Sequence, residues 1–130
     1  MTKGESLMHQ LRKATERLKE VLDQEKNEFI RDSAIQRFEF TLDLAWKTIK
    51  GVLEKEKGIV CTSPKECVRE AYRQNMIGYD EFWLKMIDLR NEAAHMYSEE
   101  KSEEIYSMLP RALEKFYELL SSLGQQVDTR

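Results

Sequence analysis

The sequence has few of the residues that interrupt regular structure or build metal and disulfide frameworks. Its 130 residues include 5 glycines, 2 prolines, 2 cysteines and 2 histidines. So few helix breakers argue against a loop-rich or all-β protein. No cluster provides the four ligands of a structural zinc site, and neither a Gly-rich phosphate loop nor paired aspartates for Mg²⁺ stand out. We therefore predict no metal or other cofactor.

Long apolar runs and an excess of positive charge are also missing. No run approaches the roughly 20 apolar residues that cross a membrane, and the first residues, MTKGESLMHQ, are too polar for a signal peptide. The formal net charge of -3 disfavours a general nucleic-acid binder but allows one local phosphate site. We expect a cytoplasmic protein with no membrane association. In that setting, Cys61 and Cys67 are expected to be free thiols.

Helical periodicity covers nearly the whole chain instead. Apolar residues recur at helical spacing in five segments, which are predicted at 4–24, 28–57, 64–75, 80–97 and from 99 onward. Gly58 is expected to end the second helix, and Ser63 with Pro64 to start the third, while Ser98 caps the fifth. Pro110 should kink that last helix.

These helices predict an all-α fold, an antiparallel four-helix up-and-down bundle with one extra short helix. Residues 1–123 are expected to form a single domain, followed by a flexible C-terminal tail at 124–130.

The segment RNEAAHMY, at the end of the fourth predicted helix, carries the most promising chemistry. Asn91 and His95 are four residues apart and share a helix face, which Arg90 flanks. A histidine near a helix C-terminus is favoured as imidazolium and suits proton transfer. An Arg and a His on a bundle helix also commonly just cap carbonyls or pair with a Glu. Metal-free RNA cleavage needs a base, an acid and a cation, so the catalytic interpretation requires a symmetric homodimer.

Several segments together resemble a known family. RNEAAH fits the R-x4-6-H motif of the HEPN superfamily. Nearly the whole chain, about residues 5–123, is similar to its nucleotidyltransferase substrate-binding family. The matching blocks are RDSAIQRFEFTLDLAWKTIK, SPKECVREAY, WLKMIDLRNEAAHMY and EEIY.

The resemblance implies a partner and two functions. Members of the family are encoded beside a minimal nucleotidyltransferase and associate with it, and many form homodimers through the motif-bearing face. One implied function is a HepT-like metal-independent endoribonuclease toxin. In it, Arg90, Asn91 and His95 would be catalytic, and the partner would silence the enzyme by AMPylation of Tyr97. The alternative is a non-catalytic subunit that binds the substrate, RNA or a nucleotide-type molecule, of a two-component nucleotidyltransferase. A scaffold without ligand is a third possibility.

Other polar residues are weaker candidates for substrate binding. Arg37 either contacts substrate or partner, or belongs to a solvated face with Glu39, Asp43 and Lys47. Asp88 either orients His95 or is a surface carboxylate.

Further candidates are two polar residues that could line a cleft and a group of aromatic residues. Tyr72 and Glu92 are candidates to line the cleft, and His9 is expected at the surface. Four aromatic residues either stack on bases or fill the core or a dimer interface: Phe38, Phe40, Trp46 and Trp83.

Overall fold

The structure is a computed structural model that describes residues 2–95 and 98–128, with side chains to residue 124. It contains five helices, which are α1 (Lys3–Leu22), α2 (Glu28–Lys57), α3 (Pro64–Arg73), α4 (Phe82–His95) and α5 (Glu99–Asp128). No strand occurs among these described residues. The predicted all-α class is therefore confirmed.

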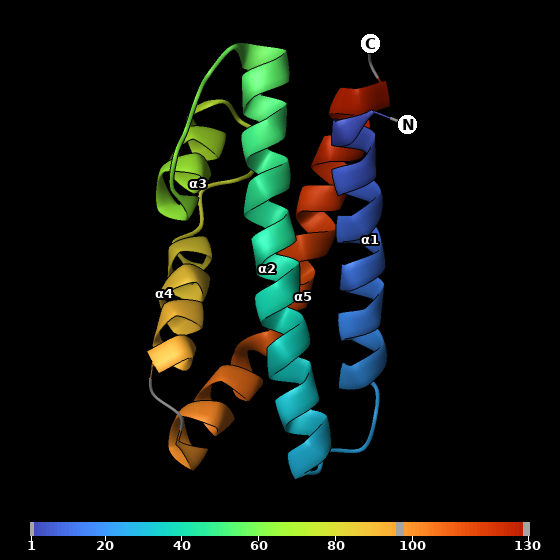
Figure 1. Cartoon of the computed structure of the whole chain (residues 1–130), viewed down its shortest axis with the longest axis vertical. Coiled ribbons are helices and arrows are strands. Elements are labelled where there is room, and N and C mark those ends of the chain that lie inside the picture. Colours follow the sequence, from blue (N-terminus) through green and yellow to red (C-terminus); the bar gives the residue numbers. More distant parts are fainter. Residues whose placement is uncertain (1, 96–97, 129–130) are drawn as a thin grey trace.

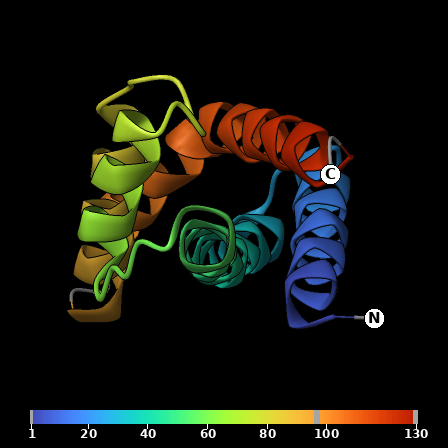
Figure 2. The same cartoon turned by 90° about the horizontal axis from the view of Figure 1, so that it is seen from above.

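The four longer helices alternate in direction along the chain. Figure 1 shows α1 and α4 running downward and α2 and α5 running upward, with α3 above α4 on the same side of α2. Viewed from above, α2 lies between α1 on one side and the α3–α4 pair on the other (Figure 2), and it packs against all four other helices. The predicted up-and-down bundle is confirmed, and α3 is the extra short helix.

Local capping chemistry explains where α2 ends and α3 begins. Gly58 ends α2 with φ 66°, a left-handed conformation that an L side chain would strain. The Ser63 hydroxyl accepts a hydrogen bond from the Glu66 backbone N–H at 3.3 Å. The Glu66 carboxylate in turn accepts from the backbone N–H of Thr62 at 3.1 Å. Both boundaries agree with the prediction.

The cysteine prediction was wrong, because Cys61 and Cys67 form a disulfide and both side chains are fully buried. Cys61 lies in the connection after α2, and Cys67 lies on the first turns of α3. The chain reverses between them, which brings their Cα atoms to 5.3 Å, within the range of a disulfide. The expectation of free thiols rested on cellular compartment and did not consider this local geometry.

The core divides the four aromatic candidates. Phe38 and Trp83 are buried, and both rings pack near Phe116, at centroid distances of 6.4 and 6.0 Å. Trp46 is half-buried against the same core. Phe40 points outward and is 61% exposed. The core alternative is therefore correct for Phe38 and Trp83, and Phe40 remains free for contacts with a ligand.

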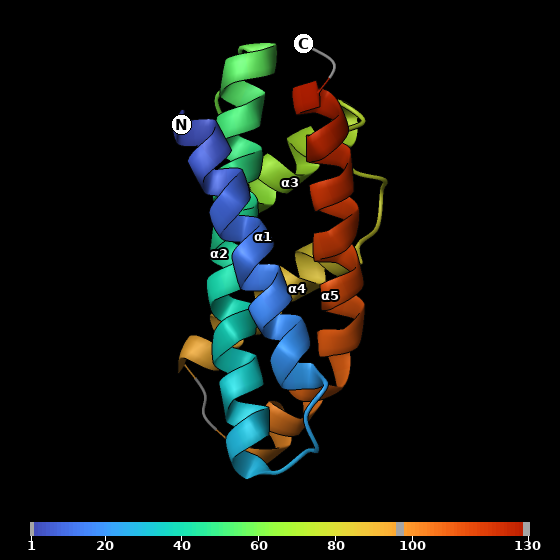
Figure 3. The same cartoon turned by 90° about the vertical axis from the view of Figure 1, so that its right-hand side faces the viewer.

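The last helix is longer than the sequence suggested. Ser98 caps it, accepting from the Lys101 backbone N–H at 3.0 Å, and the helix continues to Asp128 with Pro110 inside it. The first turns of α5 are inclined to the rest of the helix (Figures 1 and 3), which agrees with the expected kink. The domain boundary at 123 stays a prediction, although the helix extends beyond it.

Candidate functional site

The three predicted catalytic residues lie on the last two turns of α4. Asn91 and His95 are exposed on that helix, and Arg90 is half-buried beside them. Neither Asn91 nor His95 has a hydrogen-bond or ion-pair partner within residues 2–95 and 98–124, so both remain available to a ligand. Tyr97, the predicted AMP acceptor, lies outside the described residues.

Arg90 reaches from α4 to α2. Its Nη2 donates to Oδ2 of Asp43 at 2.7 Å, and the two side chains are 34% and 32% exposed. Its Nε is buried and has no acceptor within the described part of the chain. The guanidinium is therefore oriented by one carboxylate while other N–H donors remain unused.

A second carboxylate on α2 shares this environment. Glu39 lies one turn before Asp43 and is half-buried. Burial raises the pKa of Glu39 above its ordinary value, the positive charge of Arg90 opposes that rise, and the negative charge of Asp43 adds to it. The sequence placed Glu39 and Asp43 on a solvated face. The sequence shows their four-residue spacing, but it does not show that Arg90 of α4 lies beside them.

A small cavity adjoins this cluster. It has a volume of about 200 Å³ and is lined by α2, α4 and α5 through Asp32, Ile35, Gln36, Glu39, Ala93, Lys101, Ser102 and Ile105. The Nζ of Lys101 forms ion pairs with Glu92 on α4 and Glu104 on α5, each at 3.0 Å. Glu92 thus ties the end of α4 to the start of α5.

The start of α5 is also fixed to α2, by Arg31. This side chain is only 4% exposed, and its Nη1 contacts Glu99 at 2.7 Å and Glu103 at 3.0 Å, while its Nε contacts Asp32 at 3.0 Å. The Arg31 guanidinium holds the pKa of Glu99 below its ordinary value, and Lys26 and Arg31 together do the same for Glu103. Ion pairs therefore anchor both flanks of the α4–α5 connection.

The three predicted substrate-binding residues are not gathered around Arg90. Tyr72 on α3 donates a hydrogen bond to the Asp80 carbonyl, and burial raises the pKa of its phenol to about 12. Asp88 pairs with Lys65 at 2.6 Å on the α3 side of the molecule. Arg37 faces a groove between α1 and α2. Their roles in substrate binding stay predictions.

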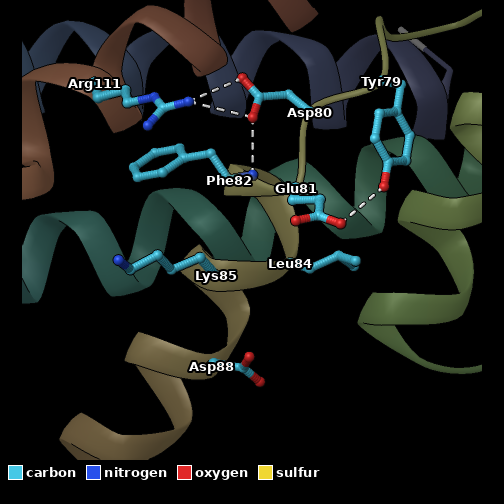
Figure 4. Close-up of a pocket in the computed structure, with 8 residues that line it drawn as sticks. All are labelled: Tyr79, Asp80, Glu81, Phe82, Leu84, Lys85, Asp88 and Arg111. Atoms are coloured by element: carbon cyan, nitrogen blue, oxygen red, sulfur yellow. Dashed lines mark hydrogen bonds and ion pairs between the residues drawn. The ribbon is translucent and has the colours of Figure 1, made fainter.

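Asp88 also borders the pocket of Figure 4, which has a volume of about 730 Å³. Asp80 is one of the residues that line this pocket. Its carboxylate accepts from the Phe82 backbone N–H at 2.9 Å and pairs with Lys115 at 2.7 Å and Arg111 at 3.3 Å. The Lys115 ion pair is the main cause that lowers the pKa of Asp80 to about 2. These contacts attach the start of α4 to α5, so we assign a structural role to the charged residues of this pocket.

Two kinds of feature are missing from the part of the chain that the structure describes. No group of three or more His, Cys, Asp and Glu side chains is arranged to hold a metal ion. No helix there combines the length and apolar character that a membrane crossing requires.

Comparison with known proteins identifies the family of this chain. Residues 6–127 match the model of the family described as nucleotidyltransferase substrate binding protein like. The chain belongs to this family. A family relationship over almost the whole chain agrees with the resemblance of the four sequence blocks, one of which ends in RNEAAHMY.

Two relatives of this family member are informative. A protein of Haemophilus influenzae named probable ribonuclease HepT is 33% identical over 97 residues, which cover 72% of this chain and 66% of that protein. A crystal structure of a protein from Thermus thermophilus is similar with a TM-score of 0.82 and 32% identity. The similarity covers 87% of this chain and 98% of that one. The bundle is thus shared with a solved structure.

Proposed function

We propose that this family member is a HepT-like endoribonuclease that works as a homodimer and cleaves RNA without a metal ion. The observation that supports the proposal most directly is that the last two turns of α4 carry an exposed His95 and a partly exposed Arg90. The name of the Haemophilus influenzae relative, probable ribonuclease HepT, points to the same activity.

The reaction uses groups that two protomers supply together. The His95 imidazole of one protomer removes the proton of a ribose 2′-hydroxyl, and the 2′-oxygen forms a bond to the adjacent phosphorus. The bond from phosphorus to the 5′-oxygen breaks as the His95 imidazolium of the other protomer donates a proton to that oxygen. The products are a 2′,3′-cyclic phosphate and a 5′-hydroxyl.

Arg90 and Asn91 assist this reaction in different ways. The Arg90 guanidinium binds the non-bridging phosphate oxygens, whose negative charge grows in the transition state. Asn91, one helical turn before His95, supplies an amide that holds the phosphate or the ribose. One protomer offers only one such histidine, so the dimer is part of the proposal.

Control of the enzyme falls to a minimal nucleotidyltransferase encoded nearby. The Tyr97 phenol oxygen attacks the α-phosphorus of ATP held by that partner, pyrophosphate leaves, and a base of the partner takes the phenol proton. The attached AMP places negative charge and bulk two residues from His95. It therefore repels and blocks the RNA phosphate, which is a toxin–antitoxin mechanism.

Cleavage of a labelled RNA in EDTA tests the ribonuclease. Wild type should release fragments with 2′,3′-cyclic phosphate ends, and His95→Ala should lower the rate by about 10²–10⁴-fold. Lys85→Ala, an exposed residue nearer the start of α4, is the matched control and should cleave normally. An RNA with 2′-deoxyribose at the cut should stay intact. If unmodified wild type cleaves no RNA, the non-catalytic substrate-binding role is favoured.

Intact-mass measurement tests the modification separately. Incubation with the partner nucleotidyltransferase and ATP should add one adenylyl group to wild type and none to Tyr97→Phe, and RNA cleavage by the modified protein should stop. An unchanged mass for wild type would exclude the AMPylation part of the proposal while leaving the ribonuclease in place.

A further inference from the structure

The groove between α1 and α2 is unlike the other pockets. It has a volume of about 700 Å³, similar to that of small-ligand sites. Its walls come from two helices and are lined by His9, Gln10, Lys13, Ala14, Arg17, Ser33, Gln36, Arg37, Phe40 and Thr41. No aspartate or glutamate is among these residues, although the chain as a whole carries a net charge of -3.

The cations of this groove keep their charge available. Nη1 of Arg37 donates to the backbone carbonyl of Arg17 at 2.7 Å, so a neutral acceptor fixes the guanidinium across the groove. Arg17 has only a loose contact with Glu20 at 3.8 Å, between side chains that are both more than half exposed. Lys13 has no ion pair within the described residues. The groove is therefore a local positive patch.

The groove also has a floor of small side chains and an exposed aromatic ring on one wall. Ala14 and Thr41 are buried at the floor, and the Thr41 hydroxyl is satisfied by the Arg37 carbonyl at 2.7 Å. Because these two side chains are small, the groove is open above them. Phe40 stands on the α2 wall with 61% of its surface exposed. An exposed aromatic ring beside several cations is the usual arrangement for binding single-stranded nucleic acid, where a base stacks on the ring.

The groove also adjoins the candidate ribonuclease site. Gln36 lines both the groove and the 200 Å³ cavity that Ala93 of α4 borders. Glu39, which shares its environment with Arg90, lines the same cavity. An RNA strand that runs from the Arg90 region to the groove would therefore cross α2 at Gln36.

We propose that the α1–α2 groove binds the single-stranded RNA that flanks the cleaved bond. Lys13, Arg17 and Arg37 hold its phosphates, and Phe40 stacks on one base. This site rests on the proposed ribonuclease function and extends it, because it gives the enzyme a preference for unpaired RNA longer than the cleaved dinucleotide. The exposed ring favours RNA over an acidic peptide, which would use the cations but has no base to stack.

Fluorescence anisotropy with a labelled 12-nucleotide single-stranded RNA tests the groove. The measurements use the full chain in a His95→Ala background, so that the RNA stays intact. The added pair Lys13→Gln and Arg17→Gln should weaken binding about ten-fold near 100 mM salt and reduce the salt slope by about 1.4, roughly 0.7 for each phosphate contact. Both side chains are exposed, and the Arg17 carbonyl that holds Arg37 remains.

Two further variants separate stacking from general charge. Phe40→Ala should weaken binding about ten-fold without changing the salt slope, because stacking carries no charge. The matched pair Lys55→Gln and Lys57→Gln, exposed at the far end of α2, removes the same charge and should leave affinity within about two-fold. If the groove and control pairs bind RNA equally well, the groove is not an RNA site.

The outcomes distinguish the groove from the cleavage mechanism. If wild type cleaves RNA and the groove variants bind as tightly as their parent, the groove inference fails and the ribonuclease stands. If wild type neither binds nor cleaves RNA, the proposed function fails. If light scattering shows that Phe40→Ala or the groove pair changes the oligomeric state, the groove is an interface between copies of the chain, and the RNA site is overturned.

Discussion

Two arginines of this bundle form ion pairs with very different surroundings. Arg31 is 4% exposed, and its guanidinium contacts three carboxylates, those of Asp32, Glu99 and Glu103. Arg90 is 34% exposed and contacts only Asp43, with a buried Nε that no acceptor meets in the described residues. The first arginine uses its donors to join two helices, while the second has an unused donor within the described residues. Unused hydrogen-bonding capacity thus distinguishes Arg90 from Arg31, whose role is structural.

Replacing Arg90 should produce the largest change in activity. Arg90→Gln removes the cation that we propose binds the transition-state phosphate, so kcat/KM for RNA should fall by about 10²–10³-fold. The urea midpoint should change little, because the Asp43 pair is one-third exposed. Steady-state cleavage and urea unfolding of the same preparation check both statements. A variant that keeps full activity would show that Arg90 has no part in catalysis.

Replacing Arg31 should have the opposite pattern, with the main effect on stability. Arg31→Gln leaves Glu99 and Glu103 without the guanidinium that joins them to α2, so the urea midpoint should fall and the start of α5 should exchange amide hydrogens faster. Arg12→Gln, an exposed arginine on α1, is the matched control and should leave both measurements unchanged. Equal midpoints for the two variants would contradict the structural role of Arg31.

Asp43 offers a smaller test of the same contrast. Asp43→Asn keeps an oxygen near Nη2 of Arg90 but removes the negative charge that would compete with an RNA phosphate at the proposed site. KM for RNA should therefore fall by about two- to five-fold at low salt, and the difference should shrink as salt is added. A rise in KM would mean that the charge of Asp43 is needed to orient Arg90.

The pH dependence of stability should differ in sign between Glu99, in the Arg31 region, and Glu39, in the Arg90 region. These are the smallest effects that we expect. The lowered pKa of Glu99 gives stability that is present above the unfolded pKa, near 4.3, and is lost as pH falls through the folded value. The raised pKa of Glu39 has the reverse effect, since its ionisation costs more in the folded state. Glu99→Gln should therefore destabilise and Glu39→Gln stabilise the protein at pH 7.

Urea unfolding of both variants at pH 7 and near pH 4 measures this difference. Each shift should shrink at the lower pH, where the carboxyl groups of the wild type become protonated. Shifts of the same sign at pH 7 would show that the Arg31 and Arg90 regions do not differ electrostatically.

Local chemistry made most of the fold predictable. The bounds of α2 followed from its apolar stripe and Gly58, and the start of α3 followed from Ser63 and Pro64, because these signals act within a few residues. The length of α5 was underestimated, since its last turns are polar and packing of the preceding apolar residues is invisible in composition.

The surroundings of the site were much less predictable. Arg90 and His95 were recognised from their motif, but Asp43 is 47 residues from Arg90, and Glu99 is 68 residues from Arg31. Such pairs depend on which helix faces become neighbours, and periodicity only states that a face is polar. The Cys61–Cys67 disulfide was missed for a related reason, because the direction of the connection between α2 and α3 decides whether the two residues meet.

The bundle also separates its two ends in a way that is useful for handling the protein. Figure 1 shows both termini at one end of the long axis, while α4 ends and α5 begins toward the opposite end. A fluorophore, affinity handle or surface tether attached at either terminus would therefore emerge remote from Arg90 and His95. Immobilised protein should therefore present the candidate site to solution, which suits surface-based binding measurements with RNA.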